Sequence, residues 1–249
     1  MDTKSSIATA AAAVTGARHL RVARNGQDAA AAWARGEVAA IVVCDGCGSG
    51  ASSEVGARLG AQLVIAGLAR RLREGARPCD PTLWDAVRGE VVEALGALGA
   101  RLGGDRAQVV HDHLLFTIVA SAVAGEDTAV WAIGDGAYAL DGDARVLGPF
   151  DDNQPPYLGY DLLGSPAPAT LATARGVGTV LVATDGVAEV GLDAVGDAAR
   201  YTRHPDALRR ELTVLARGTE RIDWAAGRVE RTPARLQDDG AVAIARRLA

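Results

Sequence analysis

The sequence predicts an α+β protein in which strands and helices are grouped along the chain rather than alternating. Three observations support this class. Two long segments with apolar residues every three or four positions follow one another, a run of short apolar segments separated by Gly and Asp-Gly comes next, and the chain ends on another short apolar run. Grouped elements of this kind favour antiparallel layers over a doubly wound parallel sheet.

The first half of the chain predicts a buried strand followed by two helices. "VAAIVVC" (38–44) is a short apolar run that ends in glycines, which is typical of a buried strand. The segment after it has apolar residues at helical spacing, and Ser52 or Ser53 is a suitable N-cap. Residues 81–102 have the same period and begin with proline, which is favoured in a first helical turn.

The second half predicts strands, then helices, then a last strand. "LLFTIVASAVAG", "TAVWAIGDG", "YALDG" and "ARVLG" predict antiparallel hairpins, because Gly and Asp-Gly punctuate them. "PFDDNQPPYLGYDLLG" (149–164) predicts a loop and "GTVLVATDG" (178–186) a buried strand. Residues 205–217 and 219–230 predict two helices, and "AVAIARRL" predicts the final strand. Because no long Pro/Gly/Ser linker interrupts the chain, we expect one domain over residues 1–249.

Composition and charge exclude several classes of function. The net charge is −5 and the basic residues are scattered among acidic ones, so we expect no nucleic-acid partner. No apolar run approaches the roughly 18 residues of a membrane helix, and we expect "IATAAAAV" (7–14) to be part of the fold rather than a leader. Three cysteines are an odd and sparse set, which suits a reducing cytoplasm, and we expect a cytoplasmic protein.

Aspartates recur where predicted strands end or begin. They follow three apolar runs, each directly before Gly, and precede two further strands: Asp45, Asp135, Asp185, Asp28, Asp238 and Asp239. Carboxylates brought together repel one another and stay ionised only when cations neutralise them. Oxygen ligands suit Mg²⁺ or Mn²⁺, and two such ions about 3.5–4 Å apart activate water against a phosphate ester. The alternative is that Asp-Gly only makes turns.

Five motifs occur in one order across residues 16–246: "GARHLRVARNGQDAA", "CDGCGSG…SSEVGA", "GDGAYAL", "VATDGV" and "QDDGAVAIA". With these motifs the chain resembles the metal-dependent protein serine/threonine phosphatases of type 2C, in particular a compact bacterial branch, which "NQPPYLGY" also resembles. The resemblance implies a four-layer α-β-β-α sandwich with two central antiparallel β-sheets. It also implies a site at the strand ends along one edge of the sandwich.

The resemblance further implies a metal centre and a reaction. Asp45 would bridge two Mn²⁺ or Mg²⁺ ions, and the Gly46 carbonyl would bind one of them. Asp185 and Asp238 would complete the first ion, Asp135 would help to hold a third, weaker one, and Asp28 would orient metal-bound water. The implied reaction is hydrolysis of phosphoserine or phosphothreonine in proteins, in which a metal-bridging hydroxide attacks phosphorus in line. The partners would be a phosphorylated protein and a cognate bacterial Ser/Thr kinase, and we expect a monomer.

Three positions depart from the family pattern. Gln27 stands where the family often has Glu, so it offers the second ion an amide oxygen and no charge. Cys47 stands where many members have a His that is thought to protonate the leaving group, and Ala23 stands where a phosphate-binding Arg is usual. The nearby candidates for binding phosphate are Arg21, Arg24 and His19.

These departures keep two alternatives open. One is a catalytically weak family member that acts as a module binding a phosphoprotein or a regulatory partner. The other is an enzyme that hydrolyses a small phosphate ester with the same ions. The intact aspartates favour an enzyme, whereas Gln27 and Cys47 favour the binding module.

Four other features suggest chemistry less strongly. Cys44 and Cys47 form a CxxC, but Cys44 ends an apolar strand instead of preceding a helix, which predicts a buried small side chain rather than a redox site. A four-cysteine zinc site is excluded because the chain has three cysteines. We expect "HDH" (111–113) in a loop or strand start, "DGD" (141–143) in a hairpin turn, and the four tryptophans in the core.

Overall fold

The computed structural model describes residues 6–151 and 154–248, and its strands form two five-stranded antiparallel sheets. Sheet A contains, in spatial order, β1 (Ser6–Val14), β12 (Gly240–Leu248), β9 (Thr179–Ala183), β6 (Gly136–Leu140) and β7 (Asp143–Leu147). Sheet B contains β2 (Ala29–Arg35), β3 (Val38–Gly46), β4 (Phe116–Ala124), β5 (Asp127–Ile133) and β8 (Thr170–Arg175). Every pair of neighbouring strands in both sheets is antiparallel.

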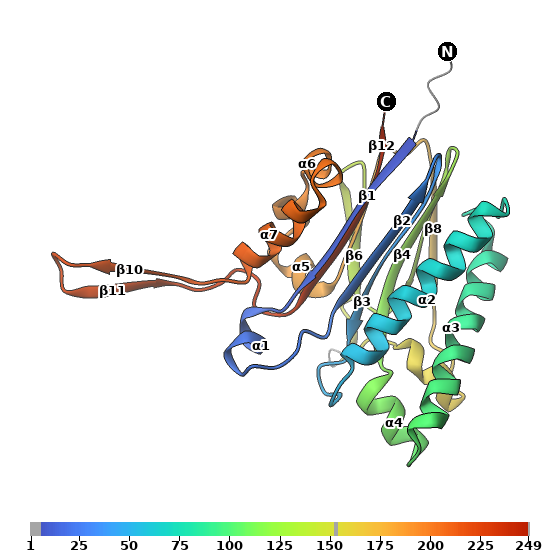
Figure 1. Cartoon of the computed structure of the whole chain (residues 1–249), viewed down its shortest axis with the longest axis horizontal. Helices are drawn as coiled ribbons and strands as arrows, with labels where there is room; N and C mark the ends of the chain where they lie inside the picture. The colour runs from blue at the N-terminus through green and yellow to red at the C-terminus, as the bar shows by residue number, and fades with distance from the viewer. Residues whose placement is uncertain (1–5, 152–153, 249) are drawn as a thin grey trace.

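Helices cover the outer faces of both sheets, as Figure 1 shows. On sheet B lie α2 (Glu54–Arg73) and α3 (Pro81–Leu102), with α4 (Arg106–His113) beside them. On sheet A lie α5 (Asp185–Val190), α6 (Ala198–Arg203) and α7 (Pro205–Leu215). The short elements are α1 (Ala17–Arg21) and the 3₁₀ helices η2 (Leu158–Leu163) and η3 (Leu192–Val195). The expected four-layer α-β-β-α sandwich is therefore confirmed.

Strand β3 explains why the sequence shows an unbroken apolar run. Ala40, Val42 and Cys44 pack into the core beneath α2 and α3, whereas Ile41 and Val43 pack between the two sheets. A strand that is buried on both faces needs apolar residues at every position, not at alternate ones. Cys44 is fully buried, which confirms the prediction of a small hydrophobic side chain.

Small side chains fill the space between the sheets. The buried residues of this layer are mostly Ala and Val: Ala39, Ala132, Ala241, Ala243, Ala245, Val43, Val119, Val123, Val130, Val177, Val180 and Val182, with Ile7 and Ile41. Interiors pack at nearly constant density, so small residues on both inner faces hold the sheets close together. The abundance of alanine and the scarcity of aromatic residues in this chain follow from that close spacing.

The helix predicted for residues 219–230 is wrong. This segment is a two-stranded hairpin, β10 (Thr219–Asp223) and β11 (Arg228–Thr232), that projects from the sandwich (Figure 1). The turn between the strands explains the difference: Gly227 has φ +62°, and the Asp223 carboxylate accepts a hydrogen bond from the Ala226 amide. Local turn chemistry thus overrides the spacing of apolar residues on which the helix prediction rests.

Three further predictions differ from the structure. The 149–164 loop contains η2, which buries Leu158 and Leu162, and β8 is not among the predicted strands. His111 and His113 lie at the end of α4 instead of in a loop or strand start. Ser53 precedes α2 as expected, but its hydroxyl makes no capping bond.

The tryptophans divide between core and surface. Trp84 and Trp131 are buried and stack with ring centroids 5.7 Å apart, and Trp33 is partly buried against the same core. Trp224 is 84% exposed at the tip of the hairpin, so the core prediction is wrong for this residue.

Two smaller findings complete the fold. The turn predicted at Asp141 and Gly142 is confirmed, because this pair joins the antiparallel strands β6 and β7. None of the described helices has the length and hydropathy needed to cross a membrane.

Glycines allow α2 to approach sheet B. A Cβ on Gly60 would lie 2.4 Å from Cε2 of the fully buried Phe116 on β4, and one on Gly56 would lie 2.5 Å from the His113 carbonyl oxygen. Gly89 on α3 is exposed, and a Cβ there would contact nothing within 4 Å. Two glycines in long helices therefore have opposite effects: Gly60 is required by packing, whereas Gly89 only weakens its helix.

Gly60→Ala should therefore lower the free energy of unfolding by about 1–3 kcal/mol, because Phe116 must move in a packed core. Gly89→Ala should raise it by up to about 1 kcal/mol, because alanine favours the helix. Urea unfolding followed by circular dichroism measures both. Equal effects of the two substitutions would contradict this account of how α2 packs.

Candidate metal centre

Strand ends from both sheets meet at one pocket of about 180 Å³. Sheet B contributes Asp45 near the end of β3 and Asp28 just before β2. Sheet A contributes Asp185, which follows β9, and Asp238, which precedes β12. Asp135 lies in the connection from β5 to β6, where the chain passes from one sheet to the other. The remaining lining residues are His19, Gln27, Gly46, Cys47, Gly48, Thr117, Pro155, Tyr157 and Asp239.

The glycines that follow two of these aspartates are required by close backbone approach. A Cβ on Gly186 would lie 2.1 Å from the carbonyl oxygen of Asp239, and one on Gly46 would lie 2.8 Å from both the Gln27 carbonyl oxygen and the Ser53 hydroxyl. Any side chain at either position would push neighbouring segments apart. The Asp-Gly pairs therefore bring the carboxylates together as well as ending the strands.

The pocket carboxylates are buried against one another. Burial raises the pKa of Asp45 well above its ordinary value, and the charges of Asp28 and Asp185 raise it further. Burial likewise raises the pKa of Asp28, although its hydrogen bond from Thr184 opposes the rise. Burial and the nearby Asp185 raise the pKa of Asp135 to about 6. Each charged form is thus disfavoured by lost hydration and by repulsion.

No described protein cation neutralises this cluster. Within the ranges 6–151 and 154–248, no basic side chain forms an ion pair with Asp28, Asp45, Asp135 or Asp185. The Asp135 Oδ1 atom is buried and has no hydrogen-bond partner among these described residues. Buried oxygens that lack both protons and partners are costly, and a hard divalent cation with oxygen ligands would satisfy them. The residues present therefore fit Mg²⁺ or Mn²⁺.

Thr184 connects the two halves of the pocket, a role that the sequence did not indicate. Its hydroxyl donates to Asp28 Oδ2 at 2.7 Å and accepts from the Ala241 amide at 2.9 Å. One side chain thus joins a carboxylate beside sheet B to the backbone of β12 in sheet A. A hydroxyl directly after an apolar run is too common a pattern for this role to be recognised without the fold.

Asp239 anchors the segment that carries His19 and Gln27. It is buried, and its two carboxylate oxygens accept hydrogen bonds from the Gly16 amide at 2.8 Å and the Gln27 amide at 2.6 Å. His19 Nδ1 lies 2.8 Å from Asp239 Oδ2. Asp239 therefore holds the turn from Gly16 to Gln27 against the start of β12.

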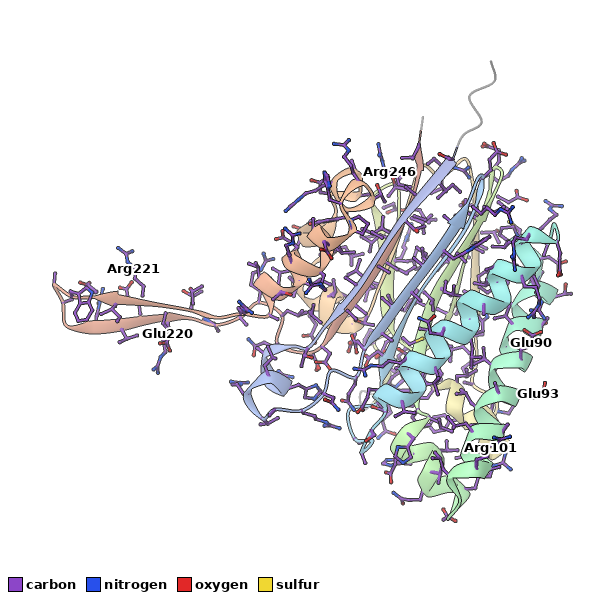
Figure 2. All side chains as sticks on the ribbon, in the orientation of Figure 1. Glu90, Glu93, Arg101, Glu220, Arg221 and Arg246 are labelled. Atoms are coloured by element: carbon purple, nitrogen blue, oxygen red, sulfur yellow. The ribbon has the colours of Figure 1, made fainter. Side chains whose placement is uncertain are left out.

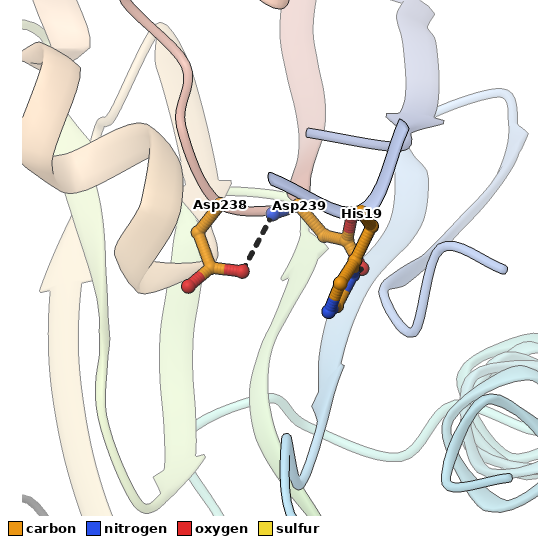
Figure 3. A group of neighbouring side chains, drawn as sticks. All are labelled: His19, Asp238 and Asp239. Carbon is orange, nitrogen blue, oxygen red and sulfur yellow. Dashed lines mark hydrogen bonds and ion pairs between the residues drawn. The ribbon is translucent and has the colours of Figure 1, made fainter. Parts of the chain in front are cut away.

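Asp238 and Asp239 differ in spite of being neighbours. Figure 3 shows the Asp238 carboxylate turned away from His19 and bonded to the Asp239 amide, at 2.8 Å. The side chain of Asp238 is 49% exposed, and Arg18 approaches it at 3.8 Å. Ligand atoms of His19, Asp238 and Asp239 lie within 4.8 Å of one another, so these three could hold an ion. Asp239 is the more engaged of the two carboxylates, because it accepts from two backbone amides and lies beside His19 Nδ1, whereas Asp238 accepts from one amide.

Gln27 and Cys47, the two departures from the family pattern, touch one another. The Gln27 side-chain amide donates to the Ser53 hydroxyl at 2.5 Å and to the Cys47 carbonyl at 3.3 Å. The Cys47 sulfur lies 3.2 Å from the Ser49 hydroxyl. Tyr157 lines the pocket nearby, and burial, followed by its contact with Cys47, raises the pKa of its phenol, so the phenol stays protonated.

The two arginines predicted to bind phosphate are not among the residues that line the pocket. The Arg24 guanidinium donates to the Gly50 carbonyl at 2.7 Å, which holds it against the loop after β3. Arg21 is exposed at the end of α1. His19 does line the pocket, and Arg18, which the sequence did not indicate, is the arginine that approaches Asp238.

The chain belongs to the protein phosphatase 2C family, because the model of that family matches residues 15–226. The family and the two-sheet architecture together define the class of the protein, which is the metal-dependent protein phosphatase fold of type 2C. No curated protein matches the chain in sequence.

Solved structures of bacterial phosphatases share the fold. The catalytic domain of the serine/threonine phosphatase PstP in complex with two manganese ions has a TM-score of 0.60 at 18% identity, covering 98% of this chain and 100% of that one. PstP/Ppp from Mycobacterium tuberculosis has a TM-score of 0.57 at 17% identity, over 97% and 98%. Stp1 from Staphylococcus aureus has a TM-score of 0.59 at 14% identity, over 96% and 94%. At these identities the likeness establishes the fold alone.

The contrast between the two neighbouring aspartates can be measured. Asp239→Asn should lower the free energy of unfolding by about 2–3 kcal/mol, because an amide nitrogen would replace an oxygen that accepts from buried donors. Asp238→Asn should change it by less than about 0.5 kcal/mol, since its exposed ion pair contributes little. Urea unfolding in the presence of a chelator tests both, and a large loss for Asp238→Asn would contradict this division of roles.

Proposed function

We propose that the protein hydrolyses phosphoserine and phosphothreonine in other proteins in a Mn²⁺- or Mg²⁺-dependent reaction. The observation that carries this proposal is the convergence of Asp28, Asp45, Asp135 and Asp185 with no ion-paired basic side chain among the described residues to balance them. Such a cluster destabilises the folded chain unless divalent ions occupy it, so binding ions is its most direct use. The family and its order of motifs favour phosphate esters as substrates.

In this proposal the pocket aspartates divide the ions among them. Asp45 and the Gly46 carbonyl, at the end of β3, would help to hold a pair of ions, with Asp185 and Asp238 from sheet A as further ligands of the first. Gln27 would offer an amide oxygen to the second ion, and Asp135, whose Oδ1 atom has no hydrogen-bond partner among the described residues, would hold a third and weaker one. When bound, the ions supply activated water and neutralise charge on the phosphoryl oxygens.

The other pocket residues orient the reactants. Asp28 is fixed by Thr184, so its second oxygen can accept a proton from an attacking water and align it. His19 is fixed by Asp239 through Nδ1, so the protonated imidazole can donate from Nε2 to a phosphoryl oxygen, and Arg18 lies at the same rim. The phenol of Tyr157 stays protonated and can donate a hydrogen bond near Cys47, where many relatives carry a histidine.

The substrate would be a phosphorylated protein, including targets of a cognate Ser/Thr kinase whose action the enzyme reverses. A cytoplasmic location suits three free cysteines, none of them paired in a disulfide. The −5 charge is consistent with protein substrates rather than nucleic acid.

Phosphate release from a phosphothreonine peptide tests the proposal. Mn²⁺ should activate the wild-type protein and a chelator should abolish activity, because the ions supply the nucleophile. Asp238→Asn should reduce the rate by at least about 100-fold, since even partners of metal ligands commonly cost 10–100-fold. The same rate with and without chelator would refute the metal-dependent mechanism.

A weakly active family member that binds a phosphoprotein is the second candidate. The observation that favours it is that position 27 carries an amide instead of a carboxylate. The side-chain nitrogen of Gln27 donates hydrogen bonds to the Ser53 hydroxyl and to the Cys47 carbonyl. A missing carboxylate weakens the second ion because ligand charge sets affinity for hard cations.

Gln27→Glu distinguishes the two candidates. In an enzyme limited by its second ion, the new carboxylate should lower the Mn²⁺ concentration for half-maximal activity by about tenfold and raise the rate. Ala86→Glu, at an exposed position of α3 that does not line the pocket, adds the same negative charge and should have little effect. A gain in neither metal affinity nor rate from Gln27→Glu would favour the binding module.

A further inference from the structure

The β10–β11 hairpin is an arm without packing partners among the described residues. It leaves the sandwich between α7 and the segment that leads to Asp238, and it extends away from both sheets (Figure 1). Every residue of its two strands is exposed except Asp223, which is half-buried. An isolated two-stranded hairpin is at best marginally stable in water, so an arm of this kind calls for a surface to pair with.

One face of the arm carries an apolar pair beside the Glu220–Arg231 ion pair, and the opposite face is charged. Ile222 and Val229 are direct cross-strand partners and are 50% and 51% exposed, and Trp224 follows at the tip with 84% exposure. The neighbouring pair, Arg221 and Glu230, must lie on the opposite face because successive side chains alternate. Figure 2 shows Glu220 and Arg221 pointing to opposite sides of the hairpin.

The charges of the arm balance within it. Its strands carry three acidic and three basic residues, and several are paired: Arg231 with Glu220 at 2.8 Å, and Arg228 with Glu230 at 2.7 Å and with Asp223 at 3.7 Å. The chain as a whole carries −5, so two copies repel elsewhere and meet at the neutral arm with least cost. A neutral arm also lacks the basic excess that would attract nucleic acid or an anionic membrane.

We propose that the arm pairs with the same arm of a second copy, through β10, in an antiparallel register centred on Ile222. In an antiparallel pair of edge strands related by a two-fold axis, directly opposite side chains must point to the same face of the joined sheet. This holds only when the axis passes between one residue and the identical residue of the other copy. If the axis passed through Glu220, Arg221 or Asp223, that charged residue would lie directly opposite the identical residue of the other copy. Centring on Ile222 sets Ile222 against Ile222, and Arg221 of each copy against Asp223 of the other.

This register uses the open edge of β10, and Asp223, which already pairs with Arg228 at 3.7 Å, gains a second basic partner in Arg221 of the other copy. It pairs the open backbone edge of β10, adds two opposite-charge pairs, and gathers Ile222, Val229 and Trp224 of both copies on one face. The contact is small, so it predicts a weak dimer and not an obligate one. This dimer differs from the monomer expected from the sequence, which predicts the arm as a helix.

The oligomeric state of the wild-type protein is the first test. Sedimentation velocity over a concentration series should show a monomer–dimer equilibrium with a dissociation constant in the micromolar range. A sedimentation coefficient that stays monomeric up to about 0.5 mM would overturn the proposal, since even weak specific contacts associate by then. In that case the arm does not bind a second copy, and a different partner protein would be its binding partner.

Charge reversal tests the register. Arg221→Asp sets Asp against Asp across the axis, and Asp223→Arg sets Arg against Arg, so each variant alone should weaken self-association by at least about tenfold. An equimolar mixture of the two should restore a dimer, because the two acidic positions of one variant then face the two basic positions of the other. A mixture that remains monomeric, while both variants give native-like circular dichroism, would contradict the Ile222-centred register.

Two controls separate the arm from general charge effects. Arg101→Asp, on α3 and far from the arm in Figure 2, changes the net charge by the same amount as Arg221→Asp and should leave the dimer intact. Trp224→Ala should weaken the dimer without changing the charge. An unchanged dimer in both Arg221→Asp and Trp224→Ala would show that association, if present, uses another surface.

Discussion

The structure is organised around repulsion among buried carboxylates. Asp28, Asp45, Asp135 and Asp185 come from different strand ends and meet in a pocket where no described basic side chain pairs with them. Two carboxylates alone in such surroundings would drive their segments apart or take up protons. The fold keeps these segments together by means that do not neutralise the charges, so the repulsion among the carboxylates remains.

Those means are backbone contacts and hydrogen bonds around the pocket rim. Gly46 and Gly186 permit backbones to approach where any side chain would clash, and Thr184 ties Asp28 to the start of β12. The carboxylate of Asp239 accepts hydrogen bonds from the backbone amides of Gly16 and Gln27 and lies beside Nδ1 of His19. The neighbouring aspartates thus have complementary roles: Asp239 fixes the frame, and Asp238 remains available at its surface.

The structure was most predictable from the sequence where a single physical requirement, such as burial on both faces, determined the residue type. β3 had to be apolar throughout because both faces are buried, and α3 was delimited by Pro81 and its period, so both were predictable. The aspartates were found because they stand where predicted strands end or begin. The β10–β11 hairpin was missed because its apolar residues also fit a helix and no described residue packs against it to decide. The positions of the arginines near the pocket were not predictable for a related reason: which side of a turn Arg18 or Arg24 occupies depends on partners distant in sequence, such as Gly50 and Asp238.

The Ala- and Val-rich layer between the sheets has a consequence for the pocket. Sheet B carries Asp28 and Asp45, whereas sheet A carries Asp185 and Asp238, so the thickness of that layer sets how far apart the two groups of oxygens stand. Residues such as Ala39 and Ala243 act as a spacer between the sheets, and the thickness of this spacer determines the distance between the sheets at the edge of the sandwich. The spacing of the pocket carboxylates is therefore a collective property of the interior, and a methyl group added deep between the sheets should change it as a substitution at the rim would.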